Sequence, residues 1–147
     1  MIAWIVTLVR VGLGVLFVVA GASKIGHADL FAAQMAGFRL LPEPVIAPAA
    51  LALPFLEVLL GGYLITGLFT RASAWAAVAL LALFDAAIAS AVVRGMTVSC
   101  GCFGPNDATV TTWAEVARDA ILVLLALLVA LRPPGMLALD RRIGNAE

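Results

Sequence analysis

Two cysteines separated by a single glycine are the residues of this chain whose types and spacing most directly suggest chemistry. Cys100 and Cys102 are the two cysteines of the sequence, and they lie in the segment Ser99–Pro105. A disulfide between them requires a tight bend, which Gly101 permits because it has no Cβ. So small a ring contributes little as a staple and is expected to exchange readily. The spacing therefore favours a redox-active pair, with Cys100 expected to be the exposed member.

The same residues also suit other chemistry. Cys100, Cys102 and the nearby Met96 would form a soft cluster of the kind that binds Cu(I). A tetrahedral zinc site would need two further ligands, and the one histidine, His27, lies in a different loop. The cysteines could also serve only to shape their loop. Redox exchange, metal capture and a structural loop are the three interpretations, and no residue is assigned to a metal.

Composition defines the environment in which these cysteines work. Of the 147 residues, 64% are hydrophobic and 12% are charged, whereas soluble domains are nearer 45–50% apolar and about 25% charged. Nine basic residues balance nine acidic ones, so no surplus of positive charge is available to bind nucleic acid. These values exclude a soluble globule and indicate an integral membrane protein.

Four apolar runs are long enough to cross a bilayer, since a spanning helix needs about 20 residues. Lipid cannot satisfy an unpaired backbone, so each run is expected to be a helix. The sequence thus predicts an all-α fold, an integral membrane four-helix transmembrane bundle, in a single domain over residues 1–147 with a short polar tail over 133–147. The first run could instead be a signal peptide ending near Ala22, but Arg10 inside it favours a retained helix. The predicted spans are Trp4–Ala22, Val45–Gly67, Ala72–Val93 and Trp113–Leu131.

Four spans place the loops over residues 23–44 and 94–112 on the same side of the membrane. Basic residues are slightly more numerous on the opposite side, which holds both termini. We therefore expect cytoplasmic termini in the inner (plasma) membrane, with the C-x-C loop extracytoplasmic. An oxidising compartment of that kind permits disulfide exchange.

Charged residues inside the predicted spans each require a partner or a function. Arg10 and Glu57 each lie 12 residues from the outer end of their run, about 18 Å deep, and are predicted to form an ion pair. Pro54 is expected to kink the helix near Glu57. Glycines such as Gly14 on the first helix are expected to permit close helix packing.

A second pair is predicted nearer the outer surface, between Asp85 and Arg118, with Asp119 facing Lys24 or the loop. Both pairs are open to two interpretations: structural pins that fix helix order, or a polar interior that binds a cofactor. The candidate polar interior comprises Arg10, Glu57, Asp85 and Arg118.

With these residues in view, the chain resembles the MauE branch of the DoxX-like family of small four-helix membrane proteins. The resemblance rests on four motifs, which together extend over residues 10–119. They are Arg10-x-Gly12 leading to Gly21–Lys24, Leu41-Pro42 followed by Leu53–Glu57, Arg94-Gly95 leading to Cys100–Gly104, and Trp113 followed by Arg118-Asp119.

The resemblance implies a membrane protein of methylamine utilisation that assists disulfide formation in a maturing dehydrogenase subunit, together with a thioredoxin-like partner. By this analogy Cys100 and Cys102 are the catalytic redox pair. Relatives of the DoxX and DoxD type imply instead a membrane subunit of a quinone-linked oxidoreductase.

Two classes of function follow. In the first, the protein relays electrons between a thioredoxin-like or disulfide-bearing protein and a quinone or second protein, through a thiol–disulfide oxidoreductase step at the C-x-C pair. Lys24 and Arg118 would lower a thiol pKa if they came close, and Phe103, Trp113 and Pro54 would border an apolar quinone slot. In the second, the protein is a non-enzymatic anchor or assembly subunit of a homo- or hetero-oligomer, or a carrier for a soft metal or small thiol.

Overall fold

Five helices make up most of the described part of the chain in the computed structural model, which describes residues 1–101, 109–132 and 138–139. Four of them coincide with the predicted spans to within two residues at each end. The prediction of an all-α fold built on these four helices is confirmed. The helices are α1 (Ile2–Lys24), α2 (Ala28–Gly37), α3 (Glu43–Thr66), α4 (Thr70–Val93) and α5 (Trp113–Leu131).

Three of the helices, α1, α3 and α4, are long and apolar enough to cross a membrane, with mean hydropathies of 2.4, 1.9 and 2.3 over their best windows. The predicted fourth span forms as the 19-residue helix α5. Among the described helices, however, only α1, α3 and α4 have the length and composition of a membrane-spanning helix. Glu115, Arg118 and Asp119 occupy its first two turns. The amino-terminal end of α5 therefore needs polar neighbours for three charged side chains.

The outward faces of the helices confirm that lipid is the surrounding solvent. Leu8, Leu51, Leu83 and Leu124 are each 60% exposed or more. A soluble protein rarely exposes large contiguous apolar patches, whereas hydrocarbon tails accept such side chains without cost. The exposed leucines therefore mark surfaces that face the bilayer.

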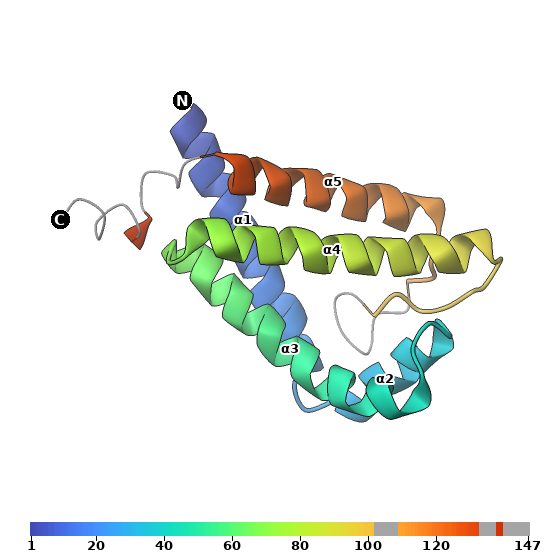
Figure 1. The fold of residues 1–147 in the computed structure, drawn as a ribbon. Coiled ribbons are helices and arrows are strands. Elements are labelled where there is room, and N and C mark those ends of the chain that lie inside the picture. The colour runs from blue at the N-terminus through green and yellow to red at the C-terminus, as the bar shows by residue number, and fades with distance from the viewer. Residues whose placement is uncertain (102–108, 133–137, 140–147) are drawn as a thin grey trace.

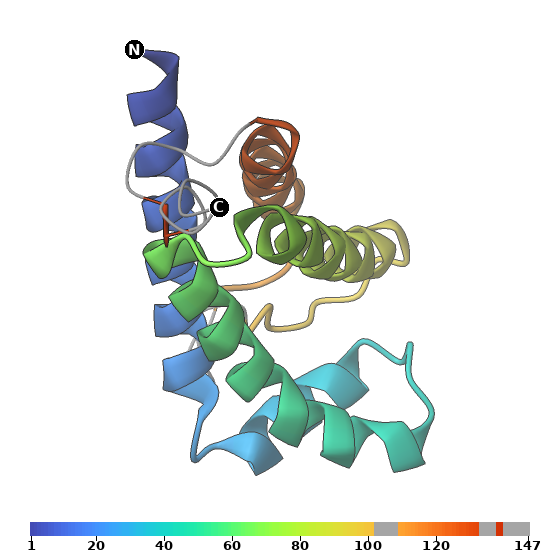
Figure 2. The ribbon, with the colours of Figure 1, turned by 60° about the vertical axis from the view of Figure 1, so that its left-hand side comes forward.

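The helices associate as two pairs that cross obliquely. In Figures 1 and 2, α1 runs beside α3, and α4 runs beside α5. Between the pairs lies an apolar core that includes Phe17 of α1, Leu64 of α3, Leu81 of α4 and Val129 of α5. At one end the pairs diverge, and α2 packs against the first half of α3 there (Figure 2).

Glycines bring α1 and α3 into close contact, as the sequence predicts. A Cβ on Gly14 would lie 2.9 Å from the carbonyl oxygen of Gly61, and one on Gly61 would lie 2.6 Å from that of Gly14. Farther along, a Cβ on Gly21 would lie 2.5 Å from the carbonyl oxygen of Pro54. Gly62, by contrast, has no such neighbour within 4 Å. The glycines that face the partner helix therefore fix the antiparallel register of α1 and α3.

The helix α2 was not predicted, because its segment was expected to be part of a loop. Its ten residues include a single fully buried side chain, that of Phe31. The Arg94 guanidinium, just after α4, donates a 2.6 Å hydrogen bond to the carbonyl oxygen of Phe38 at the end of α2. A Cβ on Gly37 would lie 2.7 Å from Cγ1 of Val98. Contacts from the segment that follows α4 thus hold α2 across the open end of the helix pairs.

Candidate functional site

The cysteine segment begins with a short antiparallel pairing that follows α4. The Cys100 N–H donates to the carbonyl oxygen of Thr109 at 3.0 Å, and the Thr111 N–H donates to that of Val98 at 3.0 Å. Ser99 and Val110 form the β-bridge between them. These bonds fix the two ends of the C-x-C loop, so the position of Cys100 is set by the backbone.

Cys100 is disulfide-bonded, and its side chain is buried, with 7% of its surface exposed. The expectation that Cys100 is the exposed cysteine of the pair is therefore wrong, because its side chain lies at the wall of an internal cavity. Cys102 and Phe103 lie outside the described residues. Gly101, which follows Cys100, has φ +62°, a backbone conformation that residues other than glycine rarely adopt.

Gln34 of α2 lies directly against this turn. A Cβ added at Gly101 would collide with the side-chain oxygen of Gln34. The left-handed backbone thus favours glycine between the two cysteines, and the Gln34 side chain occupies the space beside it. No sequence signal singled out Gln34, because its importance depends on how α2 is placed.

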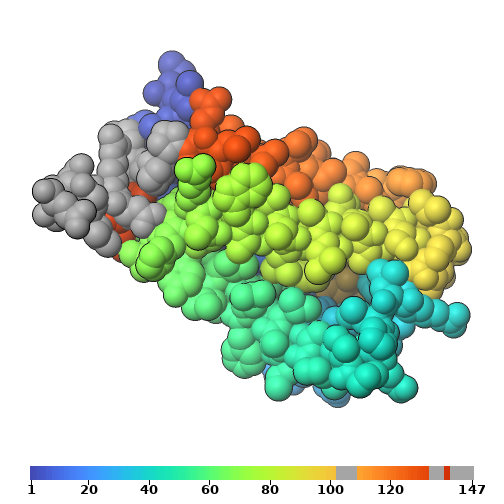
Figure 3. Space-filling view, in the orientation of Figure 1, coloured from blue at the N-terminus to red at the C-terminus, as the bar shows by residue number. Residues whose placement is uncertain are grey.

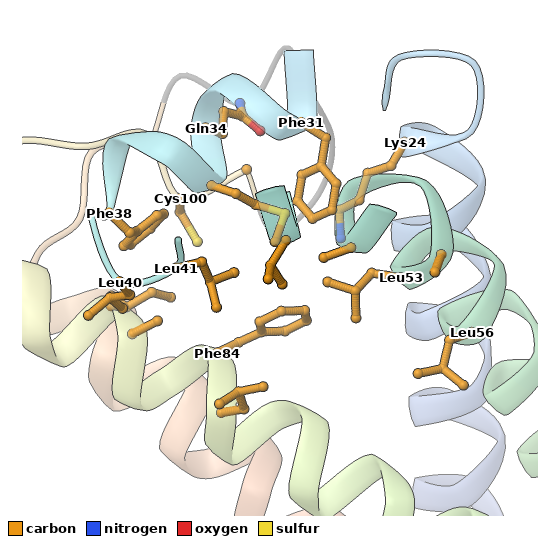
Figure 4. A pocket seen from close by; sticks show the side chains of 18 of the residues that line it. Lys24, Phe31, Gln34, Phe38, Leu40, Leu41, Leu53, Leu56, Phe84 and Cys100 are labelled. Atoms are coloured by element: carbon orange, nitrogen blue, oxygen red, sulfur yellow. The ribbon is translucent and has the colours of Figure 1, made fainter. Parts of the chain in front are cut away.

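A large apolar cavity lies between α2, α3 and α4, at the end where the helix pairs diverge. It has a volume of about 920 Å³, within the range of small-molecule sites. In Figure 3 the surface is hollowed between α4 and the end of the molecule formed by α2 and α3. Figure 4 shows Phe84 and Leu53 facing the interior, with Lys24 and Cys100 at its edge. The cavity therefore brings a disulfide sulfur and an ammonium group to the same apolar space.

Lys24, the last residue of α1, forms the main ion pair of the interior. Its Nζ lies 2.9 Å from both carboxylate oxygens of Glu57 on α3, and the two side chains are 1% and 2% exposed. The same Nζ lies 5.1 Å from the ring centroid of Phe31 and 5.8 Å from that of Phe84. Such distances are those of cation–π contacts. The ammonium group is therefore held between a carboxylate and two aromatic rings.

The predicted pair between Arg10 and Glu57 is wrong. The glycine contacts set Gly21 of α1 against Glu57, and Gly21 lies about three turns from Arg10. Arg10 is fully buried, and its Nη1 donates to the carbonyl oxygens of Leu64 and Ile65 at 2.7 and 3.3 Å. These carbonyls belong to the last turn of α3, where no intrahelical donor is available. Arg10 therefore caps α3 from the neighbouring helix.

The predicted pair between Asp85 and Arg118 is likewise replaced by other contacts. Arg118 forms ion pairs with Glu115 and Asp119 on its own helix. Asp85 lines a smaller hollow of about 360 Å³ between α4 and α5, walled mainly by alanines. Within the described residues, its buried Oδ1 has no hydrogen-bond partner. The apolar runs predict how far along its helix each charged residue lies, but not which neighbouring helix its side chain faces.

Most of the other residues predicted to border a binding site do not line the cavity. Trp113 is 63% exposed, and Pro54 packs against Gly21 of α1, so neither borders the cavity. Over residues 1–101, 109–132 and 138–139, no group of three His, Cys, Asp or Glu side chains is placed to hold a metal ion. Arg10, Asp85 and Arg118 lie apart from the cavity, and Glu57 is connected to it through Lys24.

Comparison with known proteins identifies the family. The sequence profile described as "Methylamine utilisation protein MauE" matches residues 2–132. The chain belongs to the MauE family. It is 38% identical to a methylamine utilization protein MauE of Paracoccus denitrificans over 122 residues, 82% of this chain and 66% of that protein. The Methylorubrum extorquens protein of that name is 36% identical over 83% of this chain and 66% of its own length.

A third MauE protein, from Paracoccus versutus, is 37% identical over 84% of this chain and 69% of its own length. The chain thus spans about two thirds of the length of the curated MauE relatives that it matches. No solved structure matches the chain.

Three of the motifs that carry the MauE resemblance meet in space. Gly21 and Lys24 of the first motif contact Pro54 and Glu57 of the second. Cys100 of the third lines the same cavity as Lys24. Residues far apart in the chain are therefore assembled around one apolar space, which identifies this end of the bundle as the candidate functional site.

Proposed function

We propose that this protein carries out thiol–disulfide exchange in the membrane as an accessory component of methylamine utilisation. The observation that carries the proposal is the position of Cys100, disulfide-bonded and buried at the wall of the cavity that Lys24 also lines. A cysteine that served only to shape a loop would not need to line a large cavity that an ammonium group also lines. Membership of the MauE family agrees with this role.

The exchange has two balanced steps. A thiolate of a reduced extracytoplasmic partner, either a thioredoxin-like protein or the protein that is to receive the disulfide, attacks the Cys100–Cys102 disulfide, forming a mixed disulfide and releasing one thiolate of the pair. The partner's second thiolate then attacks the mixed disulfide, which leaves the partner oxidised and the Cys100–Cys102 pair reduced. The reduced pair returns to the disulfide by passing two electrons to a quinone or a second protein.

Because Cys100 is buried, the two cysteines have different roles in the proposed exchange. An external protein thiolate reaches a buried sulfur poorly, because thiol–disulfide exchange depends on access. We therefore assign exchange with the partner to Cys102 and transfer toward the cavity to Cys100. In this arrangement the termini are cytoplasmic and the C-x-C loop is extracytoplasmic.

Trapping with single-cysteine variants tests this assignment. Cys100→Ser leaves the Cys102 thiol, whose thiolate should attack the disulfide of the oxidised partner, release the partner's other sulfur as a thiolate and form a mixed disulfide. Non-reducing electrophoresis and mass spectrometry detect this species. Cys102→Ser should trap much less of the same species, and Cys100→Ser/Cys102→Ser none. Full disulfide formation in cells carrying the double variant would contradict the proposal and favour an anchor or assembly subunit.

Labelling of intact, right-side-out membranes tests the sidedness. A bulky, impermeant maleimide should label the wild-type protein only after a reductant is added, because the cysteines are oxidised and extracytoplasmic. Labelling that appears only after the membrane is dissolved would contradict the proposed orientation. Labelling released by a metal chelator would instead indicate metal capture.

A further inference from the structure

We propose that the cavity between α2, α3 and α4 binds the ring of an isoprenoid quinone beside Phe31 and Phe84, where Lys24 donates a hydrogen bond to a ring oxygen and Cys100 supplies the electrons. The inference rests on the proposed function, because it names the electron acceptor of that exchange. It identifies a site as well as a reaction, so it is testable by binding alone.

The walls of the cavity select the body of the ligand. Aliphatic and aromatic side chains from three helices form nearly all of the lining, and the polar side chains among them are Lys24, Gln34 and Ser90. A volume of about 920 Å³ is near the upper end of the range for small-molecule sites, about 300–1,000 Å³. The cavity therefore suits a long, mostly apolar molecule with few polar atoms.

The charge at the cavity edge selects the polar end of the ligand. The two hydrogen bonds from Lys24 to Glu57 use two of the three donors of an ammonium group. One N–H is left for a further acceptor, while the ion pair as a whole is neutral. An anionic carboxylate or phosphate would meet repulsion from Glu57, whereas a neutral carbonyl oxygen would not. The site thus favours an uncharged hydrogen-bond acceptor.

The two aromatic rings beside the ammonium group add a preference for a flat ligand. Phe31 of α2 and Phe84 of α4 both line the cavity and both lie within 6 Å of Nζ of Lys24. Figure 4 shows them on different sides of the empty space, with Leu53 between them and α3. Aromatic groups associate favourably in stacked or edge-to-face arrangements. A planar ring whose oxygen accepts from Lys24 would contact these two phenyl rings.

The route into the cavity starts in the bilayer. Phe55, Leu56 and Leu59 of α3 and Leu83 of α4 line the cavity and are at the same time exposed, by 43–64%. Exposed apolar side chains on spanning helices face lipid, so the opening between α3 and α4 admits a molecule dissolved in the membrane. A water-soluble cofactor would have no comparable path.

The redox step determines the class of molecule. Reoxidation of the reduced pair forms the S–S bond and releases two electrons and two protons from the two thiols. A quinone takes up both electrons and both protons on its ring oxygens and leaves as the hydroquinone. A phospholipid acyl chain fits the walls but accepts no electrons, and a polypeptide would bring backbone polar groups that the apolar walls cannot satisfy. An isoprenoid quinone meets every condition.

Binding of decylubiquinone to the full chain in phospholipid nanodiscs tests the site. Leu53→Trp enlarges a side chain that faces the cavity, and overpacking of this kind should weaken binding about tenfold or more. Leu51→Trp is the matched control, because Leu51 lies on the same helix, is 60% exposed and does not line the cavity. Equal binding by wild type and both variants would overturn the inference.

Photolabelling of the unaltered sequence makes the test independent of how the variants fold. An azido-ubiquinone should label peptides from α2, the first half of α3 and the second half of α4, as located by mass spectrometry. Labels confined to other helices, or co-purified phospholipid that the quinone does not displace, would overturn the site.

The redox assay separates failure of this inference from failure of the proposed function. The Cys100→Ser/Cys102→Ser variant should form no quinol, because it has no thiols to oxidise. Thiol exchange by the wild type without quinone binding would overturn the quinone site and leave the proposed function standing. Quinone binding without exchange would overturn the proposed function and leave the binding site in place.

Discussion

Arg10 and Lys24 lie on the same helix and are equally buried, yet they bond to the neighbouring helix α3 in different ways. Lys24 bonds to a carboxylate on the neighbouring helix at 2.9 Å, whereas Arg10 bonds to two backbone carbonyls at the end of that helix. The carboxylate carries a full charge, and the carbonyls carry only the partial charge of a helix terminus. One cation thus forms a charged pair beside the cavity, and the other serves as a cap remote from it.

The comparison shows that a buried charge in a membrane helix is not by itself a sign of a functional site. Arg10 is the more deeply placed of the two in the predicted span, but the hydrogen bonds that it makes to α3 go to orphan carbonyls, and it does not line the cavity. Lys24 lies at the end of α1 and lines the cavity that Cys100 also lines. Location relative to the cavity, and not depth in the membrane, separates the two.

The largest effect is expected from removing the charged partner. Lys24→Met leaves the Glu57 carboxylate buried and unpaired, and breaking a buried pair in this way costs about 3–5 kcal/mol. Unfolding of the purified protein in a denaturing-detergent titration measures the loss. The Lys24→Met/Glu57→Met double variant removes both charges and should recover most of it. A double variant no more stable than the single one would contradict the assigned pair.

A smaller loss is expected at Arg10. Arg10→Met deprives the Leu64 and Ile65 carbonyls of their donor, which costs about 1–3 kcal/mol for an unsatisfied buried group. Because the stranded groups are neutral, the decrease in unfolding free energy should be less than that for Lys24→Met in the same titration. Arg10→Lys, which keeps one donor, should lie between Arg10→Met and wild type. A larger loss for Arg10→Met than for Lys24→Met would reverse the comparison.

A substitution at a glycine should disturb the register between α1 and α3 that sets the partners of Arg10 and Lys24. Gly61→Ala places a methyl group 2.6 Å from the Gly14 carbonyl oxygen and 2.8 Å from the Val18 nitrogen, and such overpacking costs about 1–3 kcal/mol. Gly62→Ala is the matched control, since the space around it is open. Alanine there should raise the unfolding free energy by about 0.5–1 kcal/mol through helix propensity. Equal effects at the two positions would show that α1 and α3 do not meet at Gly61.

The smallest effect is expected for the ion pair at the start of α5. Arg118 and Glu115 are 34% and 18% exposed and lie one turn apart, and pairs of this kind contribute about 0.2–0.5 kcal/mol. Glu115→Gln should therefore change the unfolding free energy by no more than this, and the change should shrink in high salt. A loss above about 1 kcal/mol would show that this pair acts like the buried one at Lys24.

Much of the architecture was predictable because it depends on local sequence. Four apolar runs gave four helices to within two residues at each end, since a lipid-exposed chain must satisfy its backbone internally. Residue type and spacing also mark the C-x-C segment as a candidate site of redox chemistry. The helix α2 escaped prediction because its ten residues include only one fully buried side chain, so their hydropathy does not distinguish a short helix from a loop.

The pairing of charges was not predictable from depth. The prediction placed Arg10 against Glu57 by counting residues from the ends of each run, which assumes that neighbouring helices start level. In the structure, glycine contacts shift α1 along α3 so that Lys24 reaches Glu57. The sequence suggests Lys24 as a neighbour of Asp119 or of a thiol, and it contains no signal that pairs Lys24 with Glu57.

By itself, the sequence determined that this protein is a bundle of membrane helices with a C-x-C loop after the third apolar run, because hydropathy and spacing are properties of the chain alone. Only the tertiary structure decided that Cys100 is buried, that Lys24 rather than Arg10 neutralises Glu57, and that an apolar cavity joins the two. These features depend on which helix faces meet and at what register. That choice is set by close contacts between glycines and backbone carbonyls, which residue types and spacing along one helix do not specify.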